Sequence, residues 1–96
     1  MYVVCVSFTV IPEHKNAFLN ATLKNARESL SREIDCHTFD VCSSDENNEV
    51  FLYEIYESRD AFTSHLNTDH FKQYDKCVAE MVIAKTVKSY QLVSDQ

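Results

Sequence analysis

The sequence predicts an α+β domain with the element order β-α-β-β-α-β, and two observations carry that prediction. Segments rich in β-branched and aromatic residues occupy about 2–11, 37–42, 50–57 and 86–93. Between them, about 13–32 and 58–81 repeat apolar residues at the three- and four-residue spacing of amphipathic helices. This order packs as a four-stranded antiparallel sheet with both helices on one face.

The first strand, residues 2–11, carries apolar residues on both of its alternating faces. A strand of this kind is covered on both sides. Pro12 ends it and opens the first helix, where Glu13 complements the helix dipole. Because the chain supplies no third layer, we expect the helix-free sheet face to pack against a second copy, which gives a homodimer.

The first helix presents an apolar stripe and a flank beside it. The stripe consists of Phe18, Leu19, Leu23, Ala26 and Leu30. The flank, which consists of Phe18, Thr22, Asn25 and Ser29, could line a cavity between helix and sheet. There the Asn25 amide would hydrogen-bond a substrate carbonyl or hydroxyl, although an ordinary solvated helix position explains it equally simply.

Turn and capping residues separate the later elements. Residues 43–48 form a polar turn that closes a hairpin between the second and third strands. Ser58 is placed to cap the second helix, which breaks near 67–69 and resumes through Phe71 and Met81. The segment 86–93 closes the sheet.

Composition limits the partners and cofactors. The chain has 96 residues, enough for one domain over 1–96, and a formal net charge of −6 with scattered basic residues, so nucleic acid and anionic membranes are poor partners. No apolar run spans a bilayer and no signal peptide is visible, so we expect a cytoplasmic protein with four reduced cysteines. Glycine is absent, which excludes the common nucleotide-binding loops. Cys36 and His37 are adjacent and lack zinc-site spacing, so no metal is expected.

Two histidines and one glutamate are the candidate proton carriers. His65 and His70 would lie about 140° apart on a continuous helix, although a kink near Asn67 could change that. Either could exchange protons near neutral pH, or simply be a capping or surface residue. Glu54 lies in register with apolar strand residues, so it must be paired or have a raised pKa. It could orient a histidine, act as a base, or pair structurally with a helix residue.

A set of aromatic residues could wall a substrate pocket or simply form the core. It comprises Phe39, Phe51, Tyr53, Tyr56 and Tyr90.

One family pattern gathers several of these residues. FLYEIYE at 51–57 is followed by Ala61, His65, Thr68 and the pair His70-Phe71, and it is preceded by Asn25 and the strand Phe39-Asp40-Val41. The sequence resembles the antibiotic biosynthesis monooxygenase family over nearly its whole length. Within that family the likeness is greatest to members that process the phosphorylated autoinducer-2 quorum signal. The resemblance implies a ferredoxin-like dimeric α/β barrel, and the lack of tryptophan sets the chain apart from haem-degrading members.

The resemblance implies a cofactor-independent enzyme acting on a small molecule. The leading interpretation is a monooxygenase of a quinol-like substrate, with His65 as proton carrier, Glu54 as its orienter and Asn25 as oxyanion donor. Phe39, Phe51, Tyr53, Tyr56 and His70 would then contact the substrate. The alternatives are an isomerase that degrades the phosphorylated autoinducer-2 signal, and a non-catalytic dimeric module that binds a small ligand.

Overall fold

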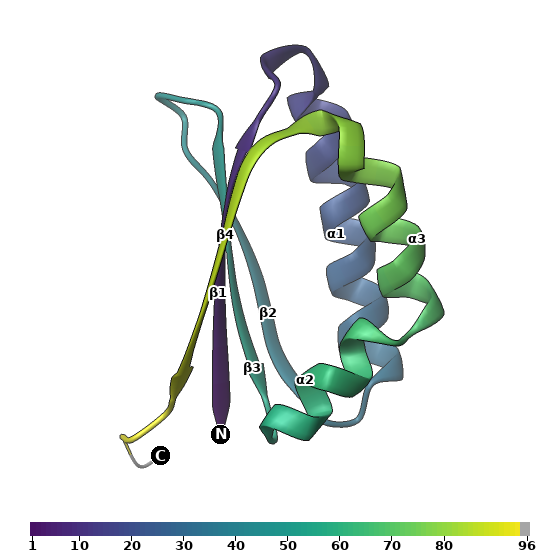
Figure 1. Cartoon of the computed structure of the whole chain (residues 1–96), viewed down its shortest axis with the longest axis vertical. Coiled ribbons are helices and arrows are strands. Elements are labelled where there is room, and N and C mark those ends of the chain that lie inside the picture. Colours follow the sequence, from purple (N-terminus) through teal and green to yellow (C-terminus); the bar gives the residue numbers. More distant parts are fainter. Residues whose placement is uncertain (95–96) are drawn as a thin grey trace.

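The computed structural model describes residues 1–94 and shows one sheet with all the helices on one side (Figure 1). The strands are β1 (Tyr2–Val10), β2 (Cys36–Ser43), β3 (Glu49–Tyr56) and β4 (Val82–Gln91). The helices are α1 (Lys15–Arg32), α2 (Arg59–Leu66) and α3 (Asp69–Val78), and the 3₁₀ turns are Pro12–His14 and Ala79–Met81. No helix in this part of the chain is long and apolar enough to cross a membrane.

The sheet is antiparallel throughout, with the strand order β2-β3-β1-β4. This confirms the predicted α+β class and four-stranded sheet. The predicted second helix is two helices, α2 and α3, because the break near Asn67 ends one and starts another. The predicted cap of α2 forms, since Ser58 Oγ accepts a hydrogen bond from Ala61 N at 3.1 Å. Thr68 caps α3 in the same way, accepting from Phe71 N at 3.2 Å.

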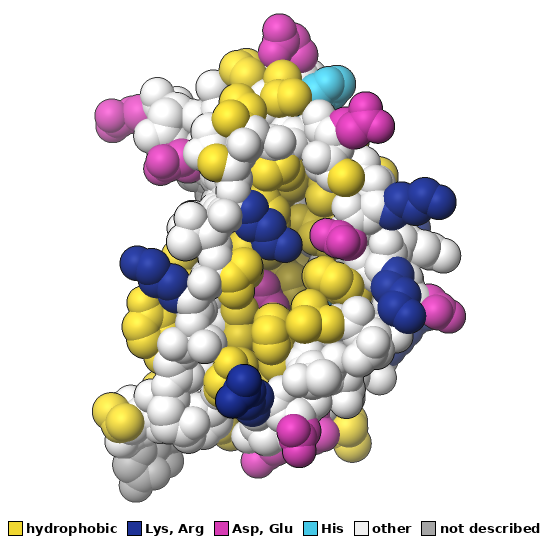
Figure 2. Space-filling model, in the orientation of Figure 1, with side chains coloured by type: hydrophobic (Ala, Val, Ile, Leu, Met, Phe, Trp, Pro, Cys, Tyr) yellow, Lys and Arg dark blue, Asp and Glu magenta, His cyan; other side chains and the backbone are white. Residues whose placement is uncertain are grey.

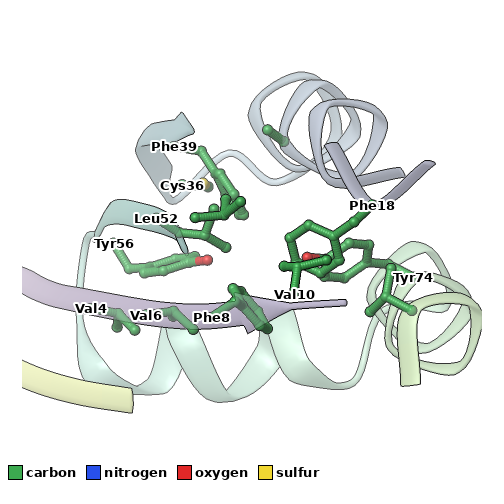
Figure 3. Packing of buried hydrophobic residues seen from close by; sticks show 13 residues of the cluster. Val4, Val6, Phe8, Val10, Phe18, Cys36, Phe39, Leu52, Tyr56 and Tyr74 are labelled. Atoms are coloured by element: carbon green, nitrogen blue, oxygen red, sulfur yellow. The ribbon is translucent and has the colours of Figure 1, made fainter. Parts of the chain in front are cut away.

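The core lies between the sheet and the helices (Figure 3). Val4, Val6, Phe8 and Val10 project from one face of β1 and are at most 6% exposed. Phe18 of α1 packs edge-on against Phe8, with ring centroids 4.9 Å apart. Alternation along β1 thus commits one face of the strand entirely to the intramolecular core.

The buried side of α1 differs from the predicted stripe. Leu23 and Leu30 are 42% and 45% exposed, whereas Thr22, Asn25 and Ser29 are at most 2% exposed. Phe18 and Ala26 of the predicted stripe are buried and Leu19 packs against the core, but the flank replaces Leu23 and Leu30 on the side that faces the sheet, so the prediction was wrong for these two leucines. Thr22 satisfies its hydroxyl by donating to the Phe18 carbonyl oxygen at 2.8 Å and by pairing with the Tyr74 hydroxyl at 2.8 Å.

Strand β4 forms an edge of the sheet that the helices leave uncovered. It begins at Val82, about four residues before the predicted start. Lys85 and Val87 lie opposite Phe8 and Val6 and therefore share their helix-side face, yet both are exposed. One side of the core is consequently open at β4.

The helix-free face of the sheet carries the other alternating set. Phe51, Tyr53 and Ile55 of β3 pair with Ser7, Cys5 and Val3 of β1, so all of these side chains project away from the helices. Tyr90 of β4 shares this face and is 52% exposed. All four cysteines are unpaired, in line with the expectation of reduced thiols.

Candidate functional site

A cavity of about 250 Å³ opens between the sheet and the helices beside β4. Its walls are mostly apolar and include Phe39, Leu52, Phe62 and Phe71. Its polar lining side chains are Asn25, Glu54, His65, Tyr74 and Lys85. Figure 2 shows the opening as a hydrophobic hollow, with an acidic side chain in its floor and a basic side chain at its rim. A small apolar cavity with a few convergent polar groups is the usual form of a small-molecule site.

His65 is the histidine of this cavity. It lies in the last turn of α2 and is 2% exposed. Four aromatic rings surround it: Phe39, Tyr56, Phe62 and Phe71, with centroids 5.0 to 6.1 Å from that of the imidazole. This packing fixes the plane of the imidazole ring.

The hydrogen-bond partner of His65 is Glu33, the residue that ends α1. Nδ1 of His65 lies 2.9 Å from Oε2 and 3.1 Å from Oε1 of Glu33. Nε2 of His70 lies 2.5 Å from the same Oε2. Burial would raise the pKa of the Glu33 carboxyl, but the hydrogen bonds and charges of the two histidines outweigh it and hold the pKa below its ordinary value.

The two histidines converge because the chain bends between α2 and α3. Thr68, the N-cap of α3, donates its hydroxyl to the His65 carbonyl oxygen at 2.7 Å and accepts from Phe71 N. This turn directs side chains five residues apart toward one carboxylate, which a continuous helix would not do.

Glu33, His65 and His70 are also the group among residues 1–94 that could hold a metal ion, with one donor atom from each within 4.8 Å of the others. Histidine and carboxylate ligands suit zinc or iron. Their donor atoms already hydrogen-bond to one another, so the cluster is complete as a hydrogen-bonded network. The expectation of no metal remains a prediction.

Glu54 lies on the sheet side of the cavity and is 3% exposed. Burial raises its pKa, against the opposing hydrogen bond that it accepts from the Tyr56 hydroxyl at 2.6 Å. It is therefore readier to hold a proton than an exposed glutamate.

Asn25 reaches the cavity from α1 and is 2% exposed. Its Oδ1 has no hydrogen-bond partner among residues 1–94. A buried amide oxygen without a partner is costly, and a bound ligand that donates a hydrogen bond would satisfy it.

Comparison with known proteins gives the family. The family profile described as antibiotic biosynthesis monooxygenase matches residues 1–76. The chain belongs to the antibiotic biosynthesis monooxygenase family. None of the curated proteins matches it.

Several solved structures share this fold. A candidate antibiotic biosynthesis monooxygenase from Nitrosomonas europaea is 28% identical, with a TM-score of 0.92 over 98% of this chain and 100% of that one. A candidate member from Caulobacter crescentus is 23% identical, with a TM-score of 0.92 over 97% and 90% of the two chains. Rv0793 from Mycobacterium tuberculosis is 22% identical, with a TM-score of 0.89 over 98% and 96%. The last two likenesses show the fold alone.

The structure brings together most of the residues that the family motif indicated. His65, Glu54, Asn25 and Phe39 all line the cavity. Tyr56 is fully buried beside it, where it contacts His65 and Glu54.

Two of the aromatic residues predicted to contact substrate, Phe51 and Tyr53, do not line this cavity. They alternate with Leu52 and Glu54 along β3, so they project from the opposite face of the sheet. The expectation that they wall the same pocket was wrong for a single chain. His70 also lines a different hollow, a groove of about 220 Å³ between α1 and α3 that also contacts Asn25.

Sequence reasoning missed Glu33 and Lys85. Glu33 is one of several charged residues near the end of the first helix, and its partners are 32 and 37 residues away. The predicted orienter of His65 was Glu54, but the hydrogen bond to the imidazole comes from Glu33. Lys85 fell outside the predicted last strand, so its position opposite Phe8 could not be read.

Proposed function

We propose that this member of the antibiotic biosynthesis monooxygenase family oxygenates a small quinol-like molecule in the cavity and needs no bound cofactor. The observation that supports this most directly is the convergence of His65, Glu54 and the buried Asn25 amide on one small, aromatic-walled cavity. These groups supply a base, a second proton-carrying group and a hydrogen-bonding group for a substrate oxygen.

The reaction begins with proton removal by His65. A phenol whose keto tautomer contains a CH₂ group loses one of its protons to the imidazole, and the negative charge moves onto the substrate oxygen. Asn25 hydrogen-bonds that oxygen through its amide N–H. Phe39 and the neighbouring rings hold the planar substrate by stacking.

Dioxygen then accepts electrons from the substrate carbanion. A carbon–oxygen bond forms, and the resulting peroxide takes the proton back from His65. The second C–H proton leaves, the O–O bond breaks, and water is released as the carbon becomes a carbonyl. One oxygen atom therefore ends in the product and the other in water, so the four electrons that dioxygen gains equal the four that the carbon loses.

Lys85 favours a second candidate, the isomerisation of a phosphorylated hydroxyketone such as the phosphorylated autoinducer-2 signal. Its Nζ lies 5.6 Å from the Phe8 ring centroid at the cavity wall, and no carboxylate in residues 1–94 forms an ion pair with it. A lysine in that position can bind a phosphate. His65 would remove a proton beside the carbonyl and return it to the neighbouring carbon, with no oxidant.

An oxygen electrode distinguishes these functions. Purified protein is mixed with a panel of quinols and anthrone-like phenols, and in parallel with the phosphorylated hydroxyketone under nitrogen. Oxygen uptake equal to quinone formed supports the monooxygenase, and rearrangement without oxygen supports the isomerase. Saturable binding with neither reaction would identify a binding module and overturn both.

His37→Ala serves as the matched control for His65 variants in these assays. His37 forms an exposed pair with Glu57 at 2.8 Å, away from the cavity, so its loss should leave either activity unchanged. Stoichiometric flavin or zinc in the active protein would contradict the proposed independence from cofactors.

The proposal includes a homodimer joined through the helix-free sheet faces. This face carries Phe51, Tyr53, Ile55 and Tyr90, of which Phe51 and Tyr90 are 38% and 52% exposed, and an exposed group of apolar residues is a usual mark of a protein interface. The location of Phe51 and Tyr53 on this face fits a contact between subunits better than a contact with substrate.

A further inference from the structure

We infer that Glu33 is a positioning residue that fixes His65 as the Nδ1–H tautomer and leaves Nε2 free to act as the base, while His70 holds Glu33 in place. The inference rests on the proposed role of His65 and adds two residues that act through it. It is carried by the geometry of two buried histidines and a half-buried glutamate from three separate segments.

The tautomer follows from the hydrogen bonds of Glu33. An ionised carboxylate only accepts hydrogen bonds, and the surroundings of Glu33 favour its ionised form. Both of its oxygens lie within 3.1 Å of Nδ1 of His65, so Nδ1 must carry the hydrogen. A neutral imidazole with a proton on Nδ1 has an unprotonated Nε2.

The free nitrogen faces away from Glu33. The hydrogen-bonding directions of Nδ1 and Nε2 diverge widely in the plane of the imidazole. Nδ1 points at Glu33, and His65 lines the cavity whereas Glu33 does not. The contacts with four aromatic rings prevent the imidazole from turning over without repacking the core. The network therefore supplies a base of defined orientation to the cavity.

His70 completes the network from the other side. Its Nε2 donates to Oε2 of Glu33, and its side chain is 6% exposed. The backbone of Glu33 is also fixed, since its N–H donates to the Ser29 carbonyl oxygen at 3.0 Å as α1 ends. The two imidazoles therefore supply the hydrogen-bond donors that a lysine or arginine would otherwise provide to this carboxylate.

The same network stabilises the charge that catalysis creates. When Nε2 takes a substrate proton, the imidazole becomes a cation whose Nδ1–H points at a carboxylate. A carboxylate in this position stabilises the imidazolium and holds its orientation, as in serine hydrolases. A glutamine in place of Glu33 keeps an acceptor oxygen but loses the charge, and its amide N–H₂ can point at either histidine.

Nitrogen-15 NMR of the histidine side chains in the intact protein tests the tautomer without any substrate. At neutral pH we expect His65 to show a protonated Nδ1 and an unprotonated Nε2, and Glu33→Gln to mix or reverse the tautomers. His37 in the exposed pair is the internal control and should be unaffected. A wild-type His65 with the proton on Nε2 would overturn the inference even if the protein proves to be an active enzyme.

Steady-state kinetics provides the second test. For Glu33→Gln we expect kcat to fall by about 10-fold or more with KM changed less than about twofold, since losing the carboxylate that orients a histidine costs about 10- to 100-fold at metal sites and about 10⁴-fold in a catalytic triad. Glu57→Gln, in the exposed pair, should have no effect. Unchanged kcat in folded Glu33→Gln would overturn the positioning role while leaving His65 itself as a candidate base.

His70 is tested by a conservative pair. His70→Gln retains an N–H donor at the same number of bonds from the backbone and should keep most of the activity, whereas His70→Leu should lower kcat as Glu33→Gln does. A rise in KM with unchanged kcat in both variants would show that His70 contacts substrate instead of holding Glu33. Circular dichroism confirms that each variant is folded before these comparisons are made.

Discussion

Replacing His65 by alanine and by asparagine separates its catalytic role from its structural one. Alanine removes the whole imidazole from a site that is 2% exposed and contacts four aromatic rings. Truncation of a large buried side chain costs about 2–5 kcal/mol of unfolding free energy. Alanine also leaves Glu33 with His70 as its remaining imidazole donor, and loss of a hydrogen bond to a buried charged group adds about 1–3 kcal/mol.

Asparagine at this position keeps the donor but removes the base. Its Nδ2 is as many bonds from the backbone as Nδ1 of histidine, so it can still donate to Glu33. We expect His65→Asn to be about 1–3 kcal/mol more stable than His65→Ala, because it retains that hydrogen bond. In a domain of this size each kcal/mol of stability changes Tm by about 4–8 °C, so the two variants should also differ in Tm.

Both variants should lose turnover by about 10²- to 10⁴-fold, the usual scale of general acid–base catalysis. Stability is measured by urea unfolding at one fixed protein concentration, since an oligomer unfolds at a concentration-dependent midpoint. Turnover is measured by oxygen uptake or by isomerisation. Wild-type turnover in His65→Asn would remove the imidazole from the mechanism. Equal stability of the two variants would show that the Glu33 hydrogen bond contributes nothing.

Three further perturbations test the cavity and the sheet face. Glu54→Gln should raise the free energy of unfolding at neutral pH but not in acid. Because burial raises the pKa of Glu54 in the folded state, the wild-type protein becomes less stable as pH rises above the ordinary glutamate value, and glutamine removes that loss. Urea unfolding midpoints measured across pH test this. Asn25→Leu should stabilise by about 1 kcal/mol yet lower turnover, whereas Ser29→Ala, at another unpaired buried group, should spare turnover. Light scattering should show a wild-type dimer that Phe51→Lys weakens; a wild-type mass of 11.1 kDa would refute it.

The sequence predicted the fold well because its periodicities are local. β1 alternates over nine residues, and Ser58 and the break near Asn67 mark helix ends through capping chemistry that depends on a few neighbouring residues. The prediction was wrong where packing decides between two helix faces. Leu23 and Leu30 are more hydrophobic than Thr22 and Ser29, yet the smaller polar residues face the sheet.

The candidate site was predicted only in part, because its geometry depends on contacts distant in sequence. The family motif indicated His65, Glu54, Asn25 and Phe39, which share the cavity. It did not indicate Glu33, which becomes a partner of His65 only after α1 and α2 pack near each other. The face of β3 on which Phe51 lies was readable from alternation with Glu54, so that error came from treating all the aromatic residues as one set.

Three unfavourable features of this interior lie around one cavity. Asn25 lacks a hydrogen-bond partner, Glu54 is a buried carboxyl with a raised pKa, and the inner face of β4 is left uncovered. Asn25 and Glu54 each lower stability, and the replacements Asn25→Leu and Glu54→Gln should remove that cost. Polar groups that violate packing rules together at one concave site are expected where function, rather than folding, has determined the residues. The opposite holds for Thr22 and Tyr74, whose hydroxyl groups satisfy each other at 2.8 Å and need no ligand. Tyr74 lines the same cavity, so this contrast is why we propose Glu54 and Asn25, rather than Tyr74, as the groups that act on a ligand beside His65.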